Sequence, residues 1–215
     1  MTARIVPDDA TGRALAVEVL REGGIVALPT DTVYGIAVSL ATPGGIERLF
    51  HVKRRPPDKG VMLLLDDARQ AVRAGTIPAA AAALMEACWP GGLTVVVPQR
   101  HDVRWPAALT GGSPTIGLRV PDHDAPRALA RAIGPLPTTS ANISGFPEAT
   151  DAAGIVAQLG DSIELVLDGG PALGGPASTI VDCTGDEPTI LRVGAVPAET
   201  VAEILAAVGV KLAGT

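Results

Sequence analysis

Short apolar runs alternate with amphipathic or Ala-rich segments along most of this chain, and this alternation constrains its fold more than any other feature. Runs rich in β-branched residues predict strands at residues 25–28, 61–65, 93–97, 115–120, 136–140, 163–167, 178–181 and 189–191. Helical spacing predicts helices at residues 9–22, 43–52, 78–89, 125–133, 152–159 and 198–208. Because several strands follow one another directly, we predict an α/β fold of the α+β type, with a twisted mixed sheet flanked by helices.

Capping residues and prolines place the ends of the first two helices. Asp8 or Asp9 is suited to cap the first helix, which two glycines then end. The second helix begins near Pro43 and stops before a pair of prolines, so Lys53 and Arg55 should lie at or just beyond its C-terminus.

Composition indicates one compact domain over residues 1–215. Hydrophobic residues make up 47% of the chain but aromatic residues only 2%, so the core should consist of Ala, Val, Leu and Ile. Charged residues interrupt the first 20 positions, and no apolar run reaches the length of a membrane span. We therefore expect a cytoplasmic protein with no membrane partner.

The segment at residues 53–59, KRRPPDK, is strongly cationic in a protein with a net charge of -6. Arg and Lys are suited to phosphate and carboxylate, so the segment predicts a site for a small, highly charged anion. The alternative is a solvated charge run that complements the helix dipole, although the prolines favour a fixed arrangement. The net negative charge of the protein argues against sequence-independent electrostatic binding of nucleic acid.

Two polar turns each follow a predicted strand, at residues 29–35 and 138–145. Their hydroxyl, carboxylate and amide groups could bond their own backbone, or they could face a ligand. The three histidines and two cysteines show no metal-ligand spacing, so no protein metal site is predicted. No motif for a covalent nucleophile is present either.

Together these segments resemble the YrdC family, in its short form, the L-threonylcarbamoyladenylate synthases. The resemblance spans residues 25–195 and keeps the order of the family's motifs: PTDTVYG (29–35), KRRP (53–56), WPGGLT (89–94), TIGLRVP (115–121), SANISG (140–145), STIVD (178–182) and LRVGA (191–195). It implies a YrdC-like domain with a concave substrate pocket. It also implies an enzyme, a nucleotidyltransferase that condenses L-threonine, bicarbonate and ATP to threonylcarbamoyl-AMP and pyrophosphate for the modification of A37 in tRNA.

The resemblance assigns roles to particular residues. It implies catalytic roles for Lys53 and Arg55. The residues implied to bind ATP are Lys53, Arg55, Lys59, Thr115, Ser140, Asn142 and Arg192. The residues implied to bind threonine are Thr32, Tyr34, Arg119, Thr138 and Ser178. Mg²⁺ is expected to arrive with ATP, and the product could be handed to a threonylcarbamoyl transferase complex.

One departure from the family pattern affects the cationic segment. The family commonly has Asn-Pro-Leu where this chain has Lys59, Gly60 and Val61, which leaves the role of Lys59 open. A second hypothesis is a YrdC-like module that binds double-stranded RNA or tRNA and has no synthase activity. A weak contact with tRNA or double-stranded RNA is also expected as a possible partner interaction of the enzyme. A third is a carbamoyl-adenylate domain from hydrogenase maturation, although the cysteines that accompany such domains are missing here.

Overall fold

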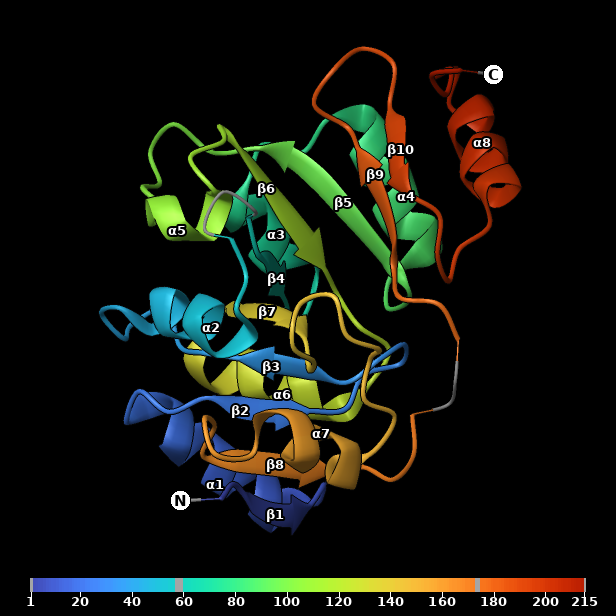
Figure 1. Cartoon of the computed structure of the whole chain (residues 1–215). Coiled ribbons are helices and arrows are strands. Elements are labelled where there is room, and N and C mark those ends of the chain that lie inside the picture. The colour runs from blue at the N-terminus through green and yellow to red at the C-terminus, as the bar shows by residue number, and fades with distance from the viewer. Residues whose placement is uncertain (1, 57–59, 173–174, 215) are drawn as a thin grey trace.

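The computed structural model describes residues 2–56, 60–172 and 175–214 (Figure 1). Within them the strands are β1 (Arg4–Pro7), β2 (Val26–Leu28), β3 (Gly35–Ala37), β4 (Met62–Leu64), β5 (Leu93–Pro98), β6 (Thr115–Arg119), β7 (Leu136–Ser140), β8 (Leu165–Asp168), β9 (Thr179–Asp182) and β10 (Thr189–Arg192). The helices are α1 (Ala10–Arg21), α2 (Gly45–Lys53), α3 (Ala68–Ala74), α4 (Ala79–Cys88), α5 (Ala107–Thr110), α6 (Asp124–Ile133), α7 (Ala152–Leu159) and α8 (Ala198–Ala207).

All these strands join one sheet, in the order β1-β8-β2-β3-β7-β4-β6-β5-β9-β10. β8 pairs in parallel with β1 and β2, as do β4 with β6 and β5 with β9, while the other neighbours are antiparallel. The predicted mixed sheet is therefore confirmed. Figure 1 shows its twist, because β2, β3 and β7 cross the view horizontally whereas β5 and β6 run diagonally.

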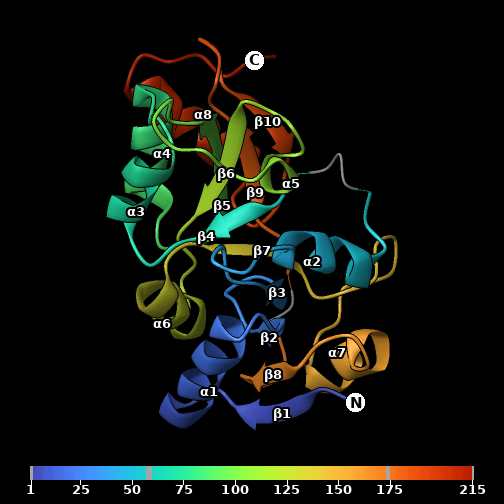
Figure 2. The ribbon, with the colours of Figure 1, turned by 90° about the vertical axis from the view of Figure 1, so that its left-hand side faces the viewer.

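The half of the sheet around β2 is buried on both faces. Val26 and Leu28 pack on the side of α1 and α6, and Ala27 packs on the opposite side with residues of α2 and α7. Figure 2 shows α1 and α6 on one side of the ribbon and α2 and α7 on the other. A strand covered on both faces has apolar residues at successive positions, which is why this part of the sequence shows little alternation.

The other half, around β5 and β6, packs against helices on one face only. Ile116 and Leu118 of β6 join the core with residues of α3, α4 and α8. Thr115, Gly117 and Arg119 alternate with them and so point to the opposite face. We call this second face of β4, β5, β6, β7 and β9 the open face, and it carries the site described below.

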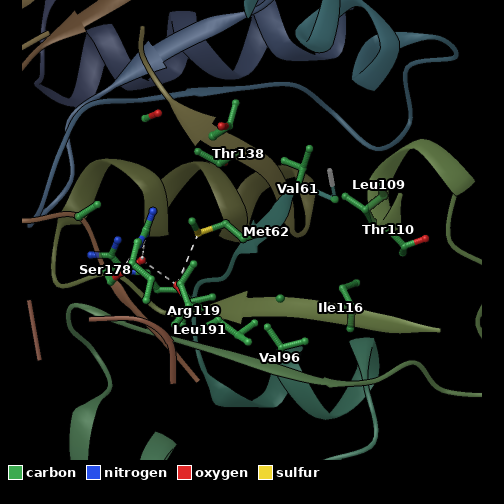
Figure 3. Close-up of a pocket in the computed structure, with 18 of the residues that line it drawn as sticks. Val61, Met62, Val96, Leu109, Thr110, Ile116, Arg119, Thr138, Ser178 and Leu191 are labelled. Carbon is green, nitrogen blue, oxygen red and sulfur yellow. Dashed lines mark hydrogen bonds between the residues drawn. The ribbon is translucent and has the colours of Figure 1, made fainter. Parts of the chain in front are cut away.

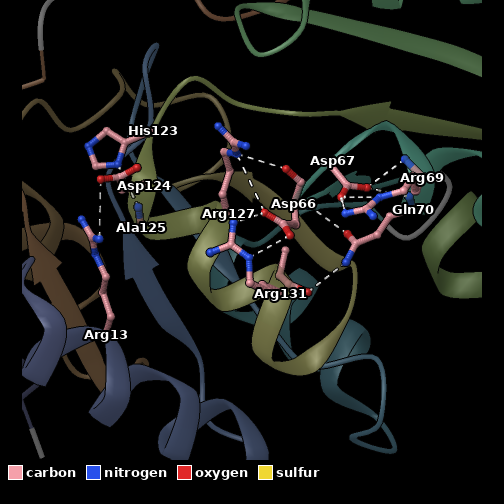
Figure 4. A network of polar contacts seen from close by, with 11 residues as sticks. Arg13, Asp66, Asp67, Arg69, Gln70, His123, Asp124, Ala125, Arg127 and Arg131 are labelled. Carbon is pink, nitrogen blue, oxygen red and sulfur yellow. Dashed lines mark hydrogen bonds and ion pairs between the residues drawn. The ribbon is translucent and has the colours of Figure 1, made fainter.

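A polar network beyond β4 holds α3 and α6 in place behind the sheet (Figure 4). The buried carboxylate of Asp66 accepts two hydrogen bonds from Arg131, at 2.7 and 3.0 Å. Arg127 donates to the Asp66 carbonyl at 3.0 Å, and Gln70 accepts from the Asp66 amide and donates to the Ala130 carbonyl. The network therefore fixes the C-terminal end of β4. Met62, at the other end of this strand, lies on the open face.

Several elements differ from the sequence-based prediction. β1, β3, α3 and α5 were not predicted, because each is short, and β3 follows directly on the polar turn at residues 29–35. α2 begins at Gly45 rather than at Pro43, after Gly44 in the left-handed region with a φ of 72°. Its end at Lys53 agrees with the prediction, and Arg54 turns the chain there with a φ of 52°.

Candidate functional site

A pocket of about 440 Å³ lies on the open face of the sheet (Figure 3). Its polar lining includes Thr32, Arg55, Thr94, Thr115, Arg119, Thr138, Thr139, Ser140, Glu148, Ser178 and Arg192. Its apolar lining includes Val61, Met62, Val96, Leu109, Ile116, Ile180 and Leu191. The pocket therefore combines three guanidinium groups and many neutral hydroxyl donors with an apolar wall.

Arg119, at the end of β6, is the most enclosed of these cations, with its side chain only 4% exposed. Its Nη2 forms an ion pair with Asp31 at 2.6 Å, its Nη1 donates to the Thr32 hydroxyl at 2.9 Å, and its Nε donates to the Gly91 carbonyl at 2.9 Å. Burial lowers the pKa of Arg119, and the Asp31 carboxylate opposes that shift. The guanidinium is thereby held in one plane, with one N–H on each terminal nitrogen left for a ligand.

The turn at residues 29–35 combines both interpretations made from the sequence. The hydroxyl of Thr30 donates to the Val33 carbonyl at 2.6 Å and accepts from the Thr32 amide at 3.1 Å, so it bonds its own backbone. Thr32 instead lines the pocket and contacts Arg119. One hydroxyl therefore shapes the turn so that the next one faces the cavity.

A second network crosses the pocket floor from β10 to β4. Arg192 donates to the Ser178 carbonyl from Nε at 3.0 Å and from Nη2 at 2.8 Å. The Ser178 and Thr94 hydroxyls lie 2.9 Å apart, and Thr94 donates in turn to the sulfur of Met62 at 3.7 Å. This chain of contacts ties four strands or their ends to one wall, and Figure 3 labels Ser178 and Met62 within it.

Arg55 lines the pocket from the loop that follows α2, and Ser140 lines it from the end of β7. Arg55 Nη2 donates to the Gly60 carbonyl at 2.9 Å. The Ser140 hydroxyl donates to Oδ1 of Asn142 at 2.6 Å. Both residues line the same pocket, although they lie 85 positions apart in the sequence.

Lys53 is buried behind that wall, with 2% of its surface exposed. Its Nζ donates to the carbonyls of Ser140 and Asn142, the latter at 2.6 Å, and to Oδ1 of Asn142 at 3.1 Å. The Ser144 amide donates to the Lys53 carbonyl at 2.9 Å. Burial, and secondarily the charge of Arg55, lowers the pKa of Lys53 to about 8, while Glu148 opposes the shift. The ammonium therefore fastens the loop after β7 to the end of α2.

Comparison with known proteins identifies the family. The profile of the Sua5/YciO/YrdC family, which carries the description "Telomere recombination", matches residues 18–194. The chain belongs to the Sua5/YciO/YrdC family.

Individual relatives of this family are similar over most of the chain. A threonylcarbamoyl-AMP synthase of Bacillus subtilis is 35% identical over 194 residues, which cover 89% of this chain and 56% of that protein. A threonylcarbamoyl-AMP synthase of Idiomarina loihiensis is 36% identical over 149 residues, covering 67% of this chain and 79% of that protein. The crystal structure of Pyrococcus abyssi Sua5 complexed with L-threonine superposes with a TM-score of 0.88 at 30% identity, covering 98% of this chain and 62% of that one. The chain thus spans little more than half the length of some of its relatives.

In this Sua5/YciO/YrdC family member, the structure brings together many residues that the resemblance implied. Those that line the pocket are Thr32, Arg55, Thr115, Arg119, Thr138, Ser140, Ser178 and Arg192. They come from the ends of β6, β7 and β10 and from the loops beside β2, α2 and β9. Lys59 lies outside the described residues.

Three other implied residues lie outside the pocket lining. Lys53 and Asn142 bond one another behind the Ser140 loop. The Tyr34 hydroxyl donates to the Gly170 carbonyl at 2.6 Å and accepts from the Gly169 amide at 3.0 Å. Tyr34 therefore links two turns, whereas Lys53 and Asn142 support the wall from behind.

Sequence reasoning missed several residues that surround the site. Asp31 lies inside a recognised motif, which was an available signal, but only the structure shows that it pairs with Arg119. Thr94 interrupts an otherwise apolar strand, so its polarity marked the open face. Glu148 lines the pocket without any local sequence signal. No group of three or more His, Cys, Asp or Glu able to hold a metal occurs among the described residues.

We predict that Asp31→Asn lowers the free energy of unfolding by about 3 kcal/mol, because it leaves the buried Arg119 cation without its counter-charge. Urea denaturation measures the loss. Asp102→Asn is the matched control, since Asp102 pairs with Arg100 at 2.6 Å on the exposed surface, where solvent screens the pair and the change should cost little stability. Equal losses in the two variants would contradict the role given to the Asp31–Arg119 pair.

The lowered pKa of Lys53 predicts a pH dependence of stability. Between pH 8 and the ordinary value of 10.5, the unfolded chain binds more protons at Lys53 than the folded chain, so this residue's contribution to stability should rise with pH. The free energy of unfolding of the wild type should therefore rise relative to that of Lys53→Met as the pH increases from 8 to 10.5. Urea denaturation of both proteins measures this difference. Lys211→Met, which removes an exposed amine, is the control. A difference that stays constant with pH would contradict the assignment.

Proposed function

We propose that this protein condenses L-threonine, bicarbonate and ATP to threonylcarbamoyl-AMP and pyrophosphate. The observation that carries the proposal is the fixed guanidinium of Arg119, which faces a pocket that also contains Arg55 and Arg192. The names of the relatives and the threonine bound in Pyrococcus abyssi Sua5 support it. Bicarbonate, the triphosphate of ATP and the carboxylate of threonine are anionic groups that repel one another, so the pocket must neutralise charge while it positions them.

Threonine would bind at the Arg119 end of the pocket. The planar guanidinium can donate from both terminal nitrogens to the two oxygens of the threonine carboxylate. Thr32, Thr138 and Ser178 line the same pocket and supply hydroxyl groups for the rest of the amino acid. Asp31 already balances the charge of Arg119. A zwitterionic amino acid has no net charge, so its binding leaves this end of the pocket electrically balanced.

ATP would bind across the remainder of the pocket. Arg55 and Ser140 would face the phosphates, with Lys59 joining them, while Thr115 and Arg192 would contact the nucleoside. Val61 and Leu109 offer an apolar wall for the base. We place Lys53, Tyr34 and Asn142 in supporting roles, because their polar groups hold the walls of the pocket in this structure.

Mg²⁺ would enter as part of the substrate, bound to the phosphate oxygens of ATP. Mg²⁺ keeps several of its waters and commonly binds through phosphates with one or two carboxylates. Glu148 is the carboxylate that the described lining offers. The cation would neutralise charge on the leaving pyrophosphate.

The reaction needs no protein nucleophile. The threonine amine would attack the carbon of bicarbonate, forming the N–C bond of a carbamate and releasing water. A carbamate oxygen would then attack the α-phosphorus, and the bond to the β-phosphate oxygen would break so that pyrophosphate leaves with the electron pair. The protein's contribution is to hold these groups in line and to stabilise the charge that develops.

The alternative of an RNA-binding module is weakened at two of the cations between residues 48 and 59. Arg48 pairs with Glu164 at 2.5 Å, and Lys53 is buried, so neither offers a free charge to a phosphate backbone. Weak contact with tRNA, and delivery of the product to a transferase complex in the cytoplasm, remain part of the proposal. No helix in the described residues is long and apolar enough to cross a membrane.

We predict that the wild-type protein, given ATP, Mg²⁺, bicarbonate and L-threonine, releases pyrophosphate and forms threonylcarbamoyl-AMP. Mass spectrometry of the nucleotide product checks this, with each of the other amino acids and a bicarbonate-free reaction as controls. Absence of the product under these conditions, or an equal yield with unrelated amino acids, would refute the proposed function.

Arg119→Lys should raise the KM for threonine by about 10- to 100-fold, since a point charge loses one of two charged hydrogen bonds worth about 1.5–3 kcal/mol. The KM for ATP should change much less, because ATP lies on other residues. Steady-state kinetics measures both constants, and Arg100→Lys, at an exposed position, serves as the control. A parallel rise in both KM values would remove Arg119 from the threonine site.

A further inference from the structure

Gly117 lies in the floor of the pocket and leaves a hollow there, because it carries no side chain. This glycine lies on β6 midway between Thr115 and Arg119, and all three line the pocket. Across the strand pair it stands opposite Val96, whose side chain also lines the pocket. On its other side lies Met62 of β4. Side chains therefore surround a point where the floor is bare backbone.

The fold itself does not require a glycine at this position. A Cβ added to Gly117 would meet the Cβ of Met62 at 3.5 Å and Cγ2 of Thr94 at 3.6 Å, which are ordinary van der Waals distances. The φ of Gly117 is not in the left-handed region, so a side chain would cause no backbone strain. Alanine also suits a strand better than glycine does, because glycine loses more conformational entropy on folding. The missing side chain thus serves the pocket rather than the sheet.

Two other glycines near the site give a contrast. A Cβ at Gly92 would lie 2.5 Å from the Cβ of Ala195, and a Cβ at Gly194 would lie 2.0 Å from the Ala177 carbonyl oxygen. Packing of the protein against itself accounts for both of these glycines. No such close contact accounts for the glycine at position 117, so we attribute this glycine to the ligands that bind in the pocket.

The position of the hollow indicates what occupies it. A strand rises about 3.4 Å per residue, so Gly117 lies about 7 Å from Thr115 and from Arg119. If Arg119 holds the threonine carboxylate, the amine on the adjacent carbon must react within a few ångströms of that guanidinium. If Thr115 contacts the nucleoside, the α-phosphate must approach from the other end of the same strand. The two reacting groups then meet above Gly117.

We propose that Gly117 is a positioning residue that keeps open the space in which the planar carbamate of threonine reaches the α-phosphorus of ATP. This inference rests on the proposed function and adds to it the place on the floor where the substrates join. A methyl group there would leave each substrate its own binding groups but would hold the reacting atoms apart. A displacement of about 1 Å at a reacting centre can lower a rate by about 100-fold.

The test compares Gly117→Ala and Gly117→Val with the wild type and with Gly185→Ala. Gly185 is the matched control, because it is exposed, has nothing within 4 Å of an added Cβ and is not in the left-handed region. Thermal unfolding reports on the fold. Calorimetry measures binding of L-threonine alone, of α,β-methylene ATP with Mg²⁺ alone, and of each in the presence of the other. Pyrophosphate release at saturating substrates measures turnover.

We expect Gly117→Ala to unfold at the temperature of the control and to bind each ligand singly with less than the tenfold weakening that corresponds to about 1.4 kcal/mol. Turnover should fall by about 100-fold, and further in Gly117→Val. The two ligands should bind independently to the wild type and compete in the variant. Unchanged turnover would overturn the inference, and so would a loss of one ligand's affinity as large as the loss of turnover.

The design separates this inference from the proposed function. If the wild type releases no pyrophosphate with threonine and bicarbonate, the proposed function fails. Calorimetry then still decides whether the two ligands meet at Gly117. A variant that shows no competition, or a wild type that binds neither ligand, would overturn the inference in that case.

Discussion

The ion pair between Arg119 and Asp31 is the interaction on which the rest of the site depends. A guanidinium that is 4% exposed is costly to bury, and it is tolerated because Asp31, Thr32 and the Gly91 carbonyl each take one of its N–H groups. Those partners come from the turn after β2 and from the turn before β5. The same contacts that satisfy the charge therefore bring three distant segments to one wall and leave the guanidinium aimed into the pocket.

The twisted sheet provides the surface on which this arrangement is built. Around β2 both faces are packed, by α1 and α6 on one side and by residues of α2 and α7 on the other. Around β6 helices pack on one face only, and the alternation of the strand divides Ile116 and Leu118 from Thr115, Gly117 and Arg119. One sheet thus supplies both a core and a polar floor. The loops after α2 and β7 then close the side of the pocket, and the buried Lys53 holds them together.

Sequence reasoning recovered the mixed sheet, most of its strands and the family, because apolar periodicity and ordered motifs are local properties of the chain. It missed β1 and β3, which are short strands that become recognisable only when β8 and β2 pair with them. The resemblance implied that Lys53 binds ATP, and that assignment stays a prediction. In the structure its ammonium lies on the carbonyls of Ser140, at the end of β7, and of Asn142 in the loop that follows. The prediction of one domain over residues 1–215 stays a prediction.

The sequence by itself determined which residue types were available: the hydroxyl-rich turns, the arginines at strand ends, and the glycine in the middle of an apolar and β-branched strand. Only the tertiary structure decided which of them face the pocket. The turn at residues 29–35 illustrates the difference, since Thr30 bonds its own backbone, Thr32 faces the cavity, and Tyr34 bonds the turn at Gly169 and Gly170. The physical reason is that the direction of a side chain depends on strand register and on packing with segments far along the chain, which no local pattern encodes.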